Sequence, residues 1–487
     1  MARETWITRV RSAFSAGLGS VRSPTGKKTH VGILAFEVAG LMSRLLHIHR
    51  SLSDAHIARL RHDTLAFEGV RKIVSDDDAF LLALACAEFT DALRLVVDST
   101  SVLAARCVEP CFSEIKEAFK LFADTGSDVY GWVFTKKEME TRAKKMDKYI
   151  SSTATLHKEM EDLSDAEHAL KKLIQCNGGC NRSLATTKLV RTITEIQEKI
   201  LWQRQEVKYK KQTSLWSCTF DAVVCLLTRS AFTVLARVKQ VFGIGYESHH
   251  LPRSLSTSPA VVYPSSDPPP PCPESSPEND DVKQIGFLES ISAMLAPPPP
   301  SLGSAALAQH YANLIIVVEK MIRTPRAVGD EARDDLYAML PASLRQLLRT
   351  RLRGVGRGVA ADAELAVKWR EALASIMDWL GPMAHATVRW QGERSFEQRR
   401  KTVSAHAATA VTVVPRANVL LLQTLHFAHK EKTEAAIAEL LVGLNYVWRF
   451  EREMSSQMLL LLNLELTASK FVNNKSINND ENIGTEA

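Results

Sequence analysis

The chain has 487 residues, of which 45% are hydrophobic and 24% are charged. This composition allows a sizeable core and excludes a chain that is disordered throughout. The net charge of +6 is too weak to indicate nucleic-acid binding by itself, but it is compatible with an anionic membrane or phosphoprotein surface. The eight cysteines form no CxxC motif, so we expect reduced, intracellular thiols.

Residues 1–28 form a basic, amphipathic N-terminal segment. Apolar residues at four-residue spacing, from Trp6 to Leu18, fall on one helical face. An organelle transit peptide, an interfacial membrane helix and an ordinary terminal helix all fit this pattern. The chain begins Met-Ala-Arg, so the glycine at position 2 that N-myristoylation requires is absent. No run of about 18 uncharged apolar residues occurs, and we expect no transmembrane helix.

Residues 29–247 are predicted to form an N-terminal helical domain. Between Val31 and Leu45, apolar residues recur at the i, i+3, i+4, i+7 spacing of a helix. A second such stretch follows Asp76–Asp78, and acidic residues there suit a helix N-terminus.

A helical hairpin is predicted within this domain. From residue 139 to 170 apolar residues recur at nearly heptad spacing, and after "CNGGC" the spacing resumes over 193–207. Two long helices joined by a glycine turn predict an antiparallel, coiled-coil-like hairpin. Thr153 and Arg142 fall at core positions, which favours a hairpin or bundle over a long rod.

Residues 248–302 are predicted to be a Pro-rich, disordered linker. Thirteen of the 19 prolines of the chain lie between Pro252 and Pro300. Proline removes backbone donors and favours extended conformations, so we expect at most a short helical turn around "QIGFLESISAML". The Ser258-Pro259 and Ser276-Pro277 pairs are candidate phosphorylation sites. The proline runs fit either a proline-reading module or, more simply, a spacer.

Residues 303–454 are predicted to form a C-terminal helical bundle. Apolar residues over 307–322 share one helical face, and Pro325 is placed to end that helix. The Gly381-Pro382 pair is expected to break a later helix. Residues 455–487 are expected to be a largely disordered tail. Alternating strand patterns are absent, so the predicted fold class is all-α, with two helical domains joined by the linker.

Several blocks of the sequence carry a family resemblance. The block "VGILAFEVAGLMSRLLHIHRSLSD" resembles the signature of an N-terminal domain of unknown function found in plant proteins. Four later blocks resemble the companion C-terminal domain of unknown function: "LGSAALAQHYANLIIVVEKM", "LYAMLPASLRQLLRTRL", "PMAHATVRWQGERSFEQ" and "NVLLLQTLHFAHKEKTEAAIAELLVGLNYVWRFE". Together these blocks are similar to the plant phytosulfokine-simulator family, over about Thr29 to Glu451 without the linker.

This resemblance implies a regulator of plant growth linked to peptide-hormone signalling, with protein partners and no assigned catalysis. It also implies an intracellular location in the nucleus or at the periphery of the plasma membrane. The best-known members carry an N-terminal glycine for myristoylation, from which this chain departs.

A stripe of arginines is the first candidate interaction site. If "ASLRQLLRTRLR" is helical, Arg345, Arg349 and Arg353 stand at i, i+4 and i+8 and form one line. Guanidinium groups bind phosphate or carboxylate, and a basic amphipathic helix is typical of a membrane surface or an acidic partner. The simpler interpretation is a solvated or ion-paired helix face.

The second candidate site lies in "PMAHATVRWQGERSFEQ". On a helix, Arg389 shares a face with Glu393, and Trp390 shares one with Arg394. We expect an ion pair in the first case, a guanidinium stacked on the indole in the second, and His385 at the end of the preceding helix. Because each charged group has a local partner, we favour a polar staple at a helix junction. An interaction site is the alternative, since Trp and Arg are frequent in binding hot spots.

The sequence therefore predicts a non-enzymatic adaptor with no catalytic, cofactor-binding or metal-binding residues. We expect no small-molecule substrate and no nucleic-acid partner. A peripheral membrane protein that binds anionic lipid through basic amphipathic helices is the alternative. An enzyme with an unfamiliar site at His385–Arg394 is a third hypothesis.

Overall fold

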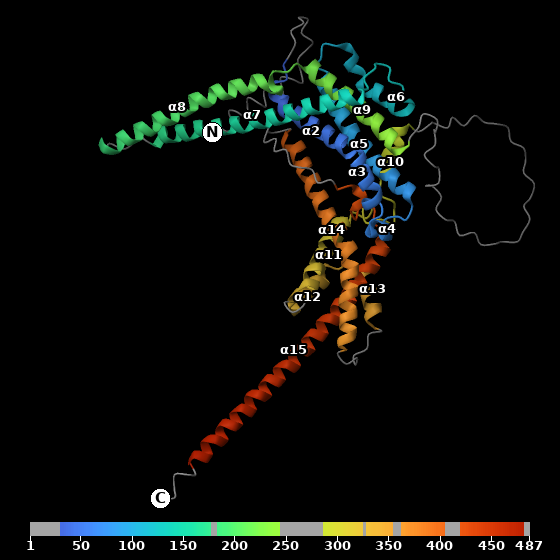
Figure 1. Ribbon diagram of the computed structural model, residues 1–487, viewed down its shortest axis with the longest axis vertical. Coiled ribbons are helices and arrows are strands. Elements are labelled where there is room, and N and C mark those ends of the chain that lie inside the picture. The colour runs from blue at the N-terminus through green and yellow to red at the C-terminus, as the bar shows by residue number, and fades with distance from the viewer. Residues whose placement is uncertain are drawn as a thin grey trace, which may run out of the picture. The chain divides into compact units, whose positions relative to one another are not determined.

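The computed structural model describes residues 30–176, 183–243, 286–324, 328–353, 362–404 and 419–481. Within these ranges the regular secondary structure is helical, apart from two isolated antiparallel bridges, and the predicted all-α fold is confirmed (Figure 1). The N-terminal segment 1–28 and most of the predicted linker lie outside them. The chain divides into two compact units. The first comprises Met1–Leu60, Leu82–Leu295 and Glu397–Arg416, and the second comprises Arg61–Leu81, Ala296–Phe396 and Ala417–Ala487.

Most helices of the first unit pack through apolar stripes. In α9 (Phe220–Phe242) the stripe is buried, the Thr219 hydroxyl accepts a hydrogen bond from the Ala222 amide, and Gly243 ends the helix at φ 70°. The helix packs against α2 and α6. The other helices of this unit are α2 (Ala35–Ser51), α3 (Asp54–Arg59), most of α5 (Asp78–Ala104), α6 (Ile115–Thr125), α7 (Lys136–Cys176), α8 (Ser183–Thr213) and α10 (Phe287–Met294), with short turns η1 (Gly32–Leu34), η3 (Pro110–Glu114) and η5 (Leu215–Ser217).

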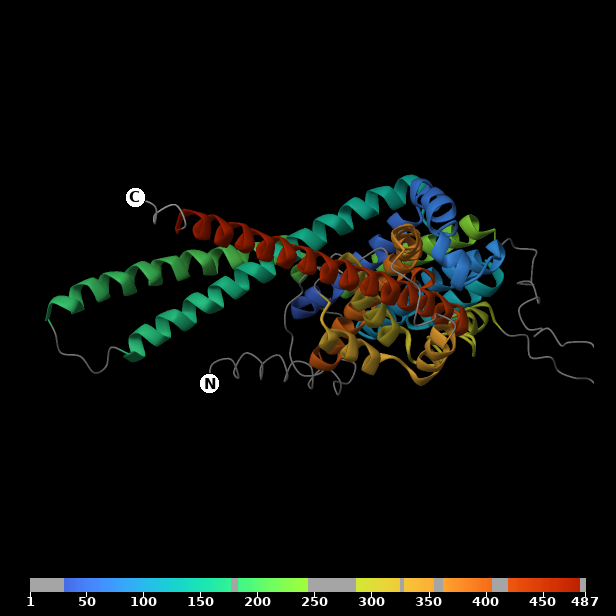
Figure 2. The ribbon, with the colours of Figure 1, turned by 90° about the horizontal axis from the view of Figure 1, so that it is seen from below.

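The predicted hairpin is formed by α7 and α8, which lie side by side in both ribbon views (Figures 1 and 2). Its direction follows from two ion pairs. Arg204 contacts Glu167 at 2.8 Å, and Lys210, six residues later, contacts Glu159, eight residues earlier, at 3.2 Å. The register therefore runs in opposite directions, as expected for an antiparallel pair. Thr153 is fully buried at its core position, where its hydroxyl accepts a hydrogen bond from a backbone amide at 3.4 Å.

The end of the predicted linker is ordered. Residues 286–302 are described, and they contain α10, which packs against α6. Ser301 and Leu302 are buried in the second unit, where the Leu302 amide donates to the Ala428 carbonyl at 2.9 Å. The boundaries predicted for the domains remain a prediction.

The second unit combines two distant parts of the chain. Helix α4 (Glu68–Ile73), from the first of these parts, packs against α15 (Lys430–Glu481), from the last. The His429 amide, just before α15, donates to the Ile73 carbonyl at 2.7 Å. A Cβ atom at Gly69 would lie 2.7 Å from the Trp379 carbonyl oxygen, so glycine permits this close approach. The remaining elements are η2 (Leu60–Thr64), α11 (Ala308–Arg323), α12 (Asp330–Met339), α13 (Ala342–Arg353), α14 (Ala363–Ser404) and η8 (Leu421–Gln423).

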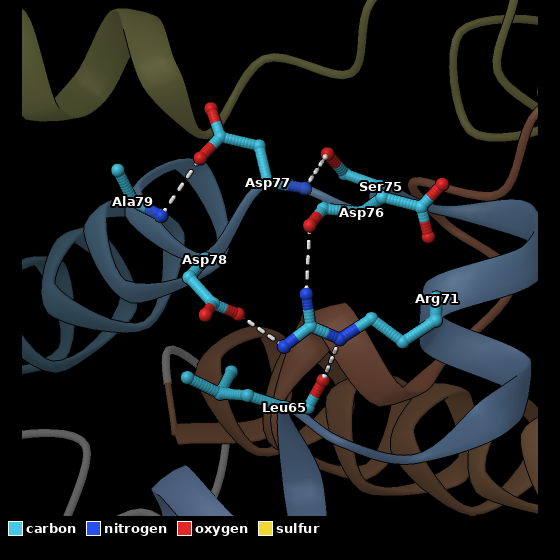
Figure 3. Close-up of polar contacts among 7 residues, drawn as sticks. All are labelled: Leu65, Arg71, Ser75, Asp76, Asp77, Asp78 and Ala79. Atoms are coloured by element: carbon cyan, nitrogen blue, oxygen red, sulfur yellow. Dashed lines mark hydrogen bonds and ion pairs between the residues drawn. The ribbon is translucent and has the colours of Figure 1, made fainter.

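Arg71 fixes the chain around α4, as Figure 3 shows. Its guanidinium donates to the Leu65 carbonyl at 2.6 Å, to the Asp76 carbonyl at 2.7 Å and to the Asp78 carboxylate. The acidic run suits a helix N-terminus as predicted, because Asp77 accepts a hydrogen bond from the Ala79 amide at 2.9 Å in the first turn of α5. One half-buried guanidinium thus joins both ends of this segment.

The expected helix break at Gly381-Pro382 is wrong. Helix α14 continues through both residues to Ser404, with Pro382 in its interior. An interior proline costs a helix roughly 3 kcal/mol. Here Trp379 and Leu380 are buried before it and Met383 after it, so packing on both sides offsets that cost.

The C-terminal end also differs from the expected disordered tail. Helix α15 continues as far as Glu481 (Figure 1). No glycine or proline interrupts residues 444–481, and the run from Met458 to Leu464 consists largely of strong helix formers. The large apolar side chains of this run are exposed, at 66% for Met458 and 64% for Leu464.

Candidate functional site

The predicted arginine stripe lies on α13, but its members have different surroundings. Arg345 donates to the Leu340 carbonyl at 2.8 Å and therefore helps to close the turn between α12 and α13. Arg349 contacts the Tyr337 hydroxyl at 2.9 Å. Arg353 is exposed at the end of the described helix. The stripe thus offers one arginine that is fixed by the backbone, one that is held by a tyrosine, and one that faces solvent.

The other faces of α13 are occupied within the second unit. Leu344 and Leu348 are buried, and Arg351 forms an ion pair with Glu439 of α15. Because both partners are about 40% exposed, this pair contributes little to stability. An apolar face that is already packed cannot insert into a bilayer, so α13 has only its charged face left for binding.

The second candidate site is a polar cluster on α14. As predicted, the guanidinium of Arg394 lies over the indole of Trp390, 5.0 Å from the ring centre. A further member of this cluster is His426, whose ring centre is 5.8 Å from that of Trp390. Arg389 is exposed, and its pairing with Glu393 remains a prediction.

His385 does not end a helix, contrary to expectation. Its Nε2 atom lies 2.7 Å from a carboxylate oxygen of Glu319 in α11, so the contact joins two helices of the second unit. Because α14 continues through Gly381-Pro382, no helix end exists there for His385 to cap.

The electrostatics of the cluster favour a neutral imidazole at His426. Burial lowers the pKa of His426, and the nearby positive charge of Arg394 lowers it further. The close approach of Gly303 shows how tightly the ring is held, since a Cβ there would lie 2.7 Å from Nδ1. The α14 cluster, formed by His385, Arg389, Trp390 and Arg394 with His426, is therefore a packed polar joint with an exposed cationic edge.

A buried polar cluster in the second unit was missed by the sequence analysis. Glu434 of α15 is 7% exposed and accepts hydrogen bonds from the Tyr311 hydroxyl at 2.5 Å and from Ser343 at 2.7 Å. Burial raises the pKa of Tyr311, and the hydrogen bond to Glu434 raises it further. The signal in the sequence is a glutamate on the same helical face as the buried Ile437 and Leu441.

The described residues contain neither a candidate metal-binding cluster nor a candidate membrane-spanning helix. Among them no three His, Cys, Asp or Glu side chains are placed to hold a metal ion. None of the helices in that part of the chain combines the length and the apolar character needed to cross a bilayer.

Comparison with known proteins identifies two domain families. Residues 33–89 match a domain of unknown function, DUF3475, and residues 301–389 match a protein of unknown function, DUF668. No solved structure matches the chain.

Three curated proteins of Arabidopsis thaliana are similar to most of the chain. Protein PSK SIMULATOR 1 is 27% identical over 89% of this chain, PSK SIMULATOR 3 is 24% identical over 86%, and PSK SIMULATOR 2 is 24% identical over 92%. The matched regions span 58%, 56% and 64% of those proteins, so the chain covers only part of their length. The two domains and the three relatives confirm that this chain is related to the PSK simulator family.

Proposed function

We propose that this protein is a non-enzymatic adaptor in plant growth signalling linked to the peptide hormone phytosulfokine. The observation that carries the proposal is the match to three PSK SIMULATOR proteins over about nine tenths of the chain. The adaptor role goes beyond those names. It is supported by a helical architecture in which long helices present exposed charged surfaces.

The absence of catalysis is proposed from the chemistry of the α14 cluster. A catalytic set commonly leaves a polar group directed at a cleft and shifts its pKa toward the working pH. Here His385 is paired with Glu319, and Trp390 contacts both Arg394 and His426. Groups that are satisfied by one another favour a structural and binding role over acid–base chemistry.

The surface proposed for partner binding consists of exposed arginines on two helices of the second unit. Arg349 and Arg353 stand on α13, and Arg389 and Arg394 stand on α14. Guanidinium groups form two parallel hydrogen bonds with carboxylate or phosphate, so an acidic or phosphorylated protein is the expected partner.

The growth role can be tested in Arabidopsis thaliana plants that lack the three relatives. The chain is expressed in these plants, and root length is measured with and without phytosulfokine. Restored growth is the expected result. A matched chain with Arg349→Ala and Arg353→Ala should accumulate equally but restore less. Failure of the well-expressed parent chain to alter root length would exclude the growth role.

The alternative is peripheral binding to anionic membranes, at the nucleus or plasma membrane. The net charge of +6 and the exposed Arg353 and Arg389 favour it. Co-sedimentation with phosphatidylcholine vesicles, with and without phosphatidylserine, distinguishes the two functions. Binding that depends on phosphatidylserine and is lost in Arg353→Ala/Arg389→Ala would support the membrane role, and equal recovery with both vesicles would refute it.

A further inference from the structure

We propose that α10 is an internal ligand seated in a docking site on α6 and α9, and that this site accepts an acidic amphipathic helix from a partner when α10 leaves it. The inference goes beyond the growth role, and its test does not depend on that role. Its basis is the set of contacts that α10 makes within the first unit, where it packs against α6.

The docking site supplies a cap to the helix that it holds. The N-cap residue of α10 is Gly286, which has no side chain to accept a hydrogen bond. Asp124 of α6 accepts instead from the Phe287 amide at 2.7 Å. A carboxylate placed at a helix N-terminus satisfies a free amide and complements the positive end of the helix dipole. The site therefore recognises the start of a helix.

Two lysines recognise the next features of α10. Lys120 stands one turn before Asp124 on α6 and forms an ion pair with Glu289 at 3.0 Å. Lys239, in the last turn of α9, donates to the Phe122 carbonyl at 2.9 Å and lies 5.7 Å from the ring centres of both Phe122 and Phe287. The site thus selects an aromatic residue at the first helical position and an acid at the third.

The environment of Lys239 agrees with this role. Burial lowers its pKa, whereas the carboxylate of Asp124 acts in the opposite direction. The Lys239 ammonium lies over the Phe287 ring, so the docked helix supplies part of the surroundings of this lysine. A docking helix without an aromatic residue at this position would lose the cation–π contact with Lys239.

The anchoring of α10 is weak enough for exchange. The helix has eight residues, and only Ile291 among them is buried, at 4% exposure. An isolated helix of this length is not stable in water. The side chains of the Lys120–Glu289 pair are 52% and 61% exposed, so salt screens their attraction. By contrast, α9 buries twelve of its 23 residues.

The partner chemistry follows from these anchors. It is a helix with an aromatic residue, an acid two positions later and an aliphatic residue two positions after that, which is the pattern of Phe287, Glu289 and Ile291. Asp124 would repel an anionic lipid or nucleic acid at the same point. The site therefore fits the helix-in-groove mode of recognition.

The test uses the full chain and a fluorescent peptide of residues 286–297. In the release variant, Phe287→Ala and Ile291→Ala remove the two apolar anchors of α10. Ser292→Ala, at an exposed position of the same helix, is the matched control. In the parent and control chains α10 is tethered beside the site and competes with the peptide at an effective concentration on the order of millimolar. The peptide should therefore bind the release variant at least about tenfold more tightly than either of those chains.

A charge exchange tests the register of binding. Lys120→Glu in the release variant should weaken binding of the peptide, and a peptide with Glu289→Lys should regain binding to that protein. Circular dichroism verifies that each variant keeps its helical content. Hydrogen exchange should show α10 opening in the parent chain at a rate above that of α9.

Two results would overturn the proposal. One is absence of peptide binding to a release variant that has retained its helical content. The other is protection of α10 in the parent chain equal to that of α9, which would make α10 a permanent part of the core.

Discussion

The buried hydrogen bonds of Glu434 allow the sharpest prediction of stability. Tyr311→Phe removes only the hydroxyl that donates to Glu434 at 2.5 Å. The ring stays in place, so no cavity is created, and Ser343 remains as the other donor, at 2.7 Å. A hydrogen bond to a charged group is worth about 1.5–3 kcal/mol, and we expect that loss in the free energy of unfolding of the second unit.

Hydrogen exchange measured by mass spectrometry is the suitable assay, because it reads α11, α13 and α15 separately and needs no two-state transition. The expected loss corresponds to roughly tenfold to a hundredfold faster exchange in these helices. Tyr337→Phe is the matched control. Its hydroxyl contacts the exposed Arg349, so we expect a change below about 0.5 kcal/mol.

The pH dependence of stability is a second test of the Tyr311–Glu434 hydrogen bond. The pKa of Tyr311 is raised by burial and by Glu434, so the folded state holds this proton more tightly than the unfolded chain. That contribution is complete below pH of about 10, the usual tyrosine pKa, and is lost as pH rises above it. Tyr311→Phe should therefore show a flatter alkaline decline. Exchange rates in Tyr311→Phe no faster than in the control would refute the reasoning.

Three further predictions concern single positions in the second unit. Arg71→Ala should lower the free energy of unfolding, measured in urea, by about 2–3 kcal/mol. Arg71→Lys should recover only part of that loss, because lysine lacks the guanidinium fork that reaches three acceptors. Equal stability of Arg71→Ala and the parent chain would contradict this. Gly69→Ala should lower the free energy of unfolding by about 1–3 kcal/mol, because the added Cβ would lie 2.7 Å from both Met383 and the Trp379 carbonyl. An unchanged midpoint of urea unfolding would show that α4 is loosely held. Arg353→Ala should change the free energy of unfolding by less than about 0.5 kcal/mol and should weaken partner binding, because the side chain is exposed. A clear loss of stability in this variant would contradict that prediction.

Periodicity in the sequence predicted the hairpin and helices with long apolar stripes, such as α2 and α11. The heptad-like spacing of α7 and α8 is local information, because it can be read from each segment without knowledge of distant residues. Pro382 shows where local rules fail. Its effect depends on whether the flanking residues are buried, and the burial of Trp379 and Met383 is a property of the tertiary fold.

The candidate sites were predictable only where both partners share a helix. The stacking of Trp390 and Arg394 follows from their i, i+4 spacing and is present. The partners of His385 and Trp390 lie in other segments, at Glu319 and His426, and no spacing rule connects them. A contact across 66 residues depends on the packing of α11 against α14, which only the folded chain specifies.

The placement of α4 with the second unit affects how the protein is made. Roughly 350 residues separate α4 from the start of α15, against which it packs. At typical synthesis rates the ribosome needs roughly 20 to 70 seconds to cover that distance. For that time Val70 and Ile73, which become almost fully buried, have no α15 to cover them on the nascent chain. The second unit thus completes its fold only after α15 has been synthesised.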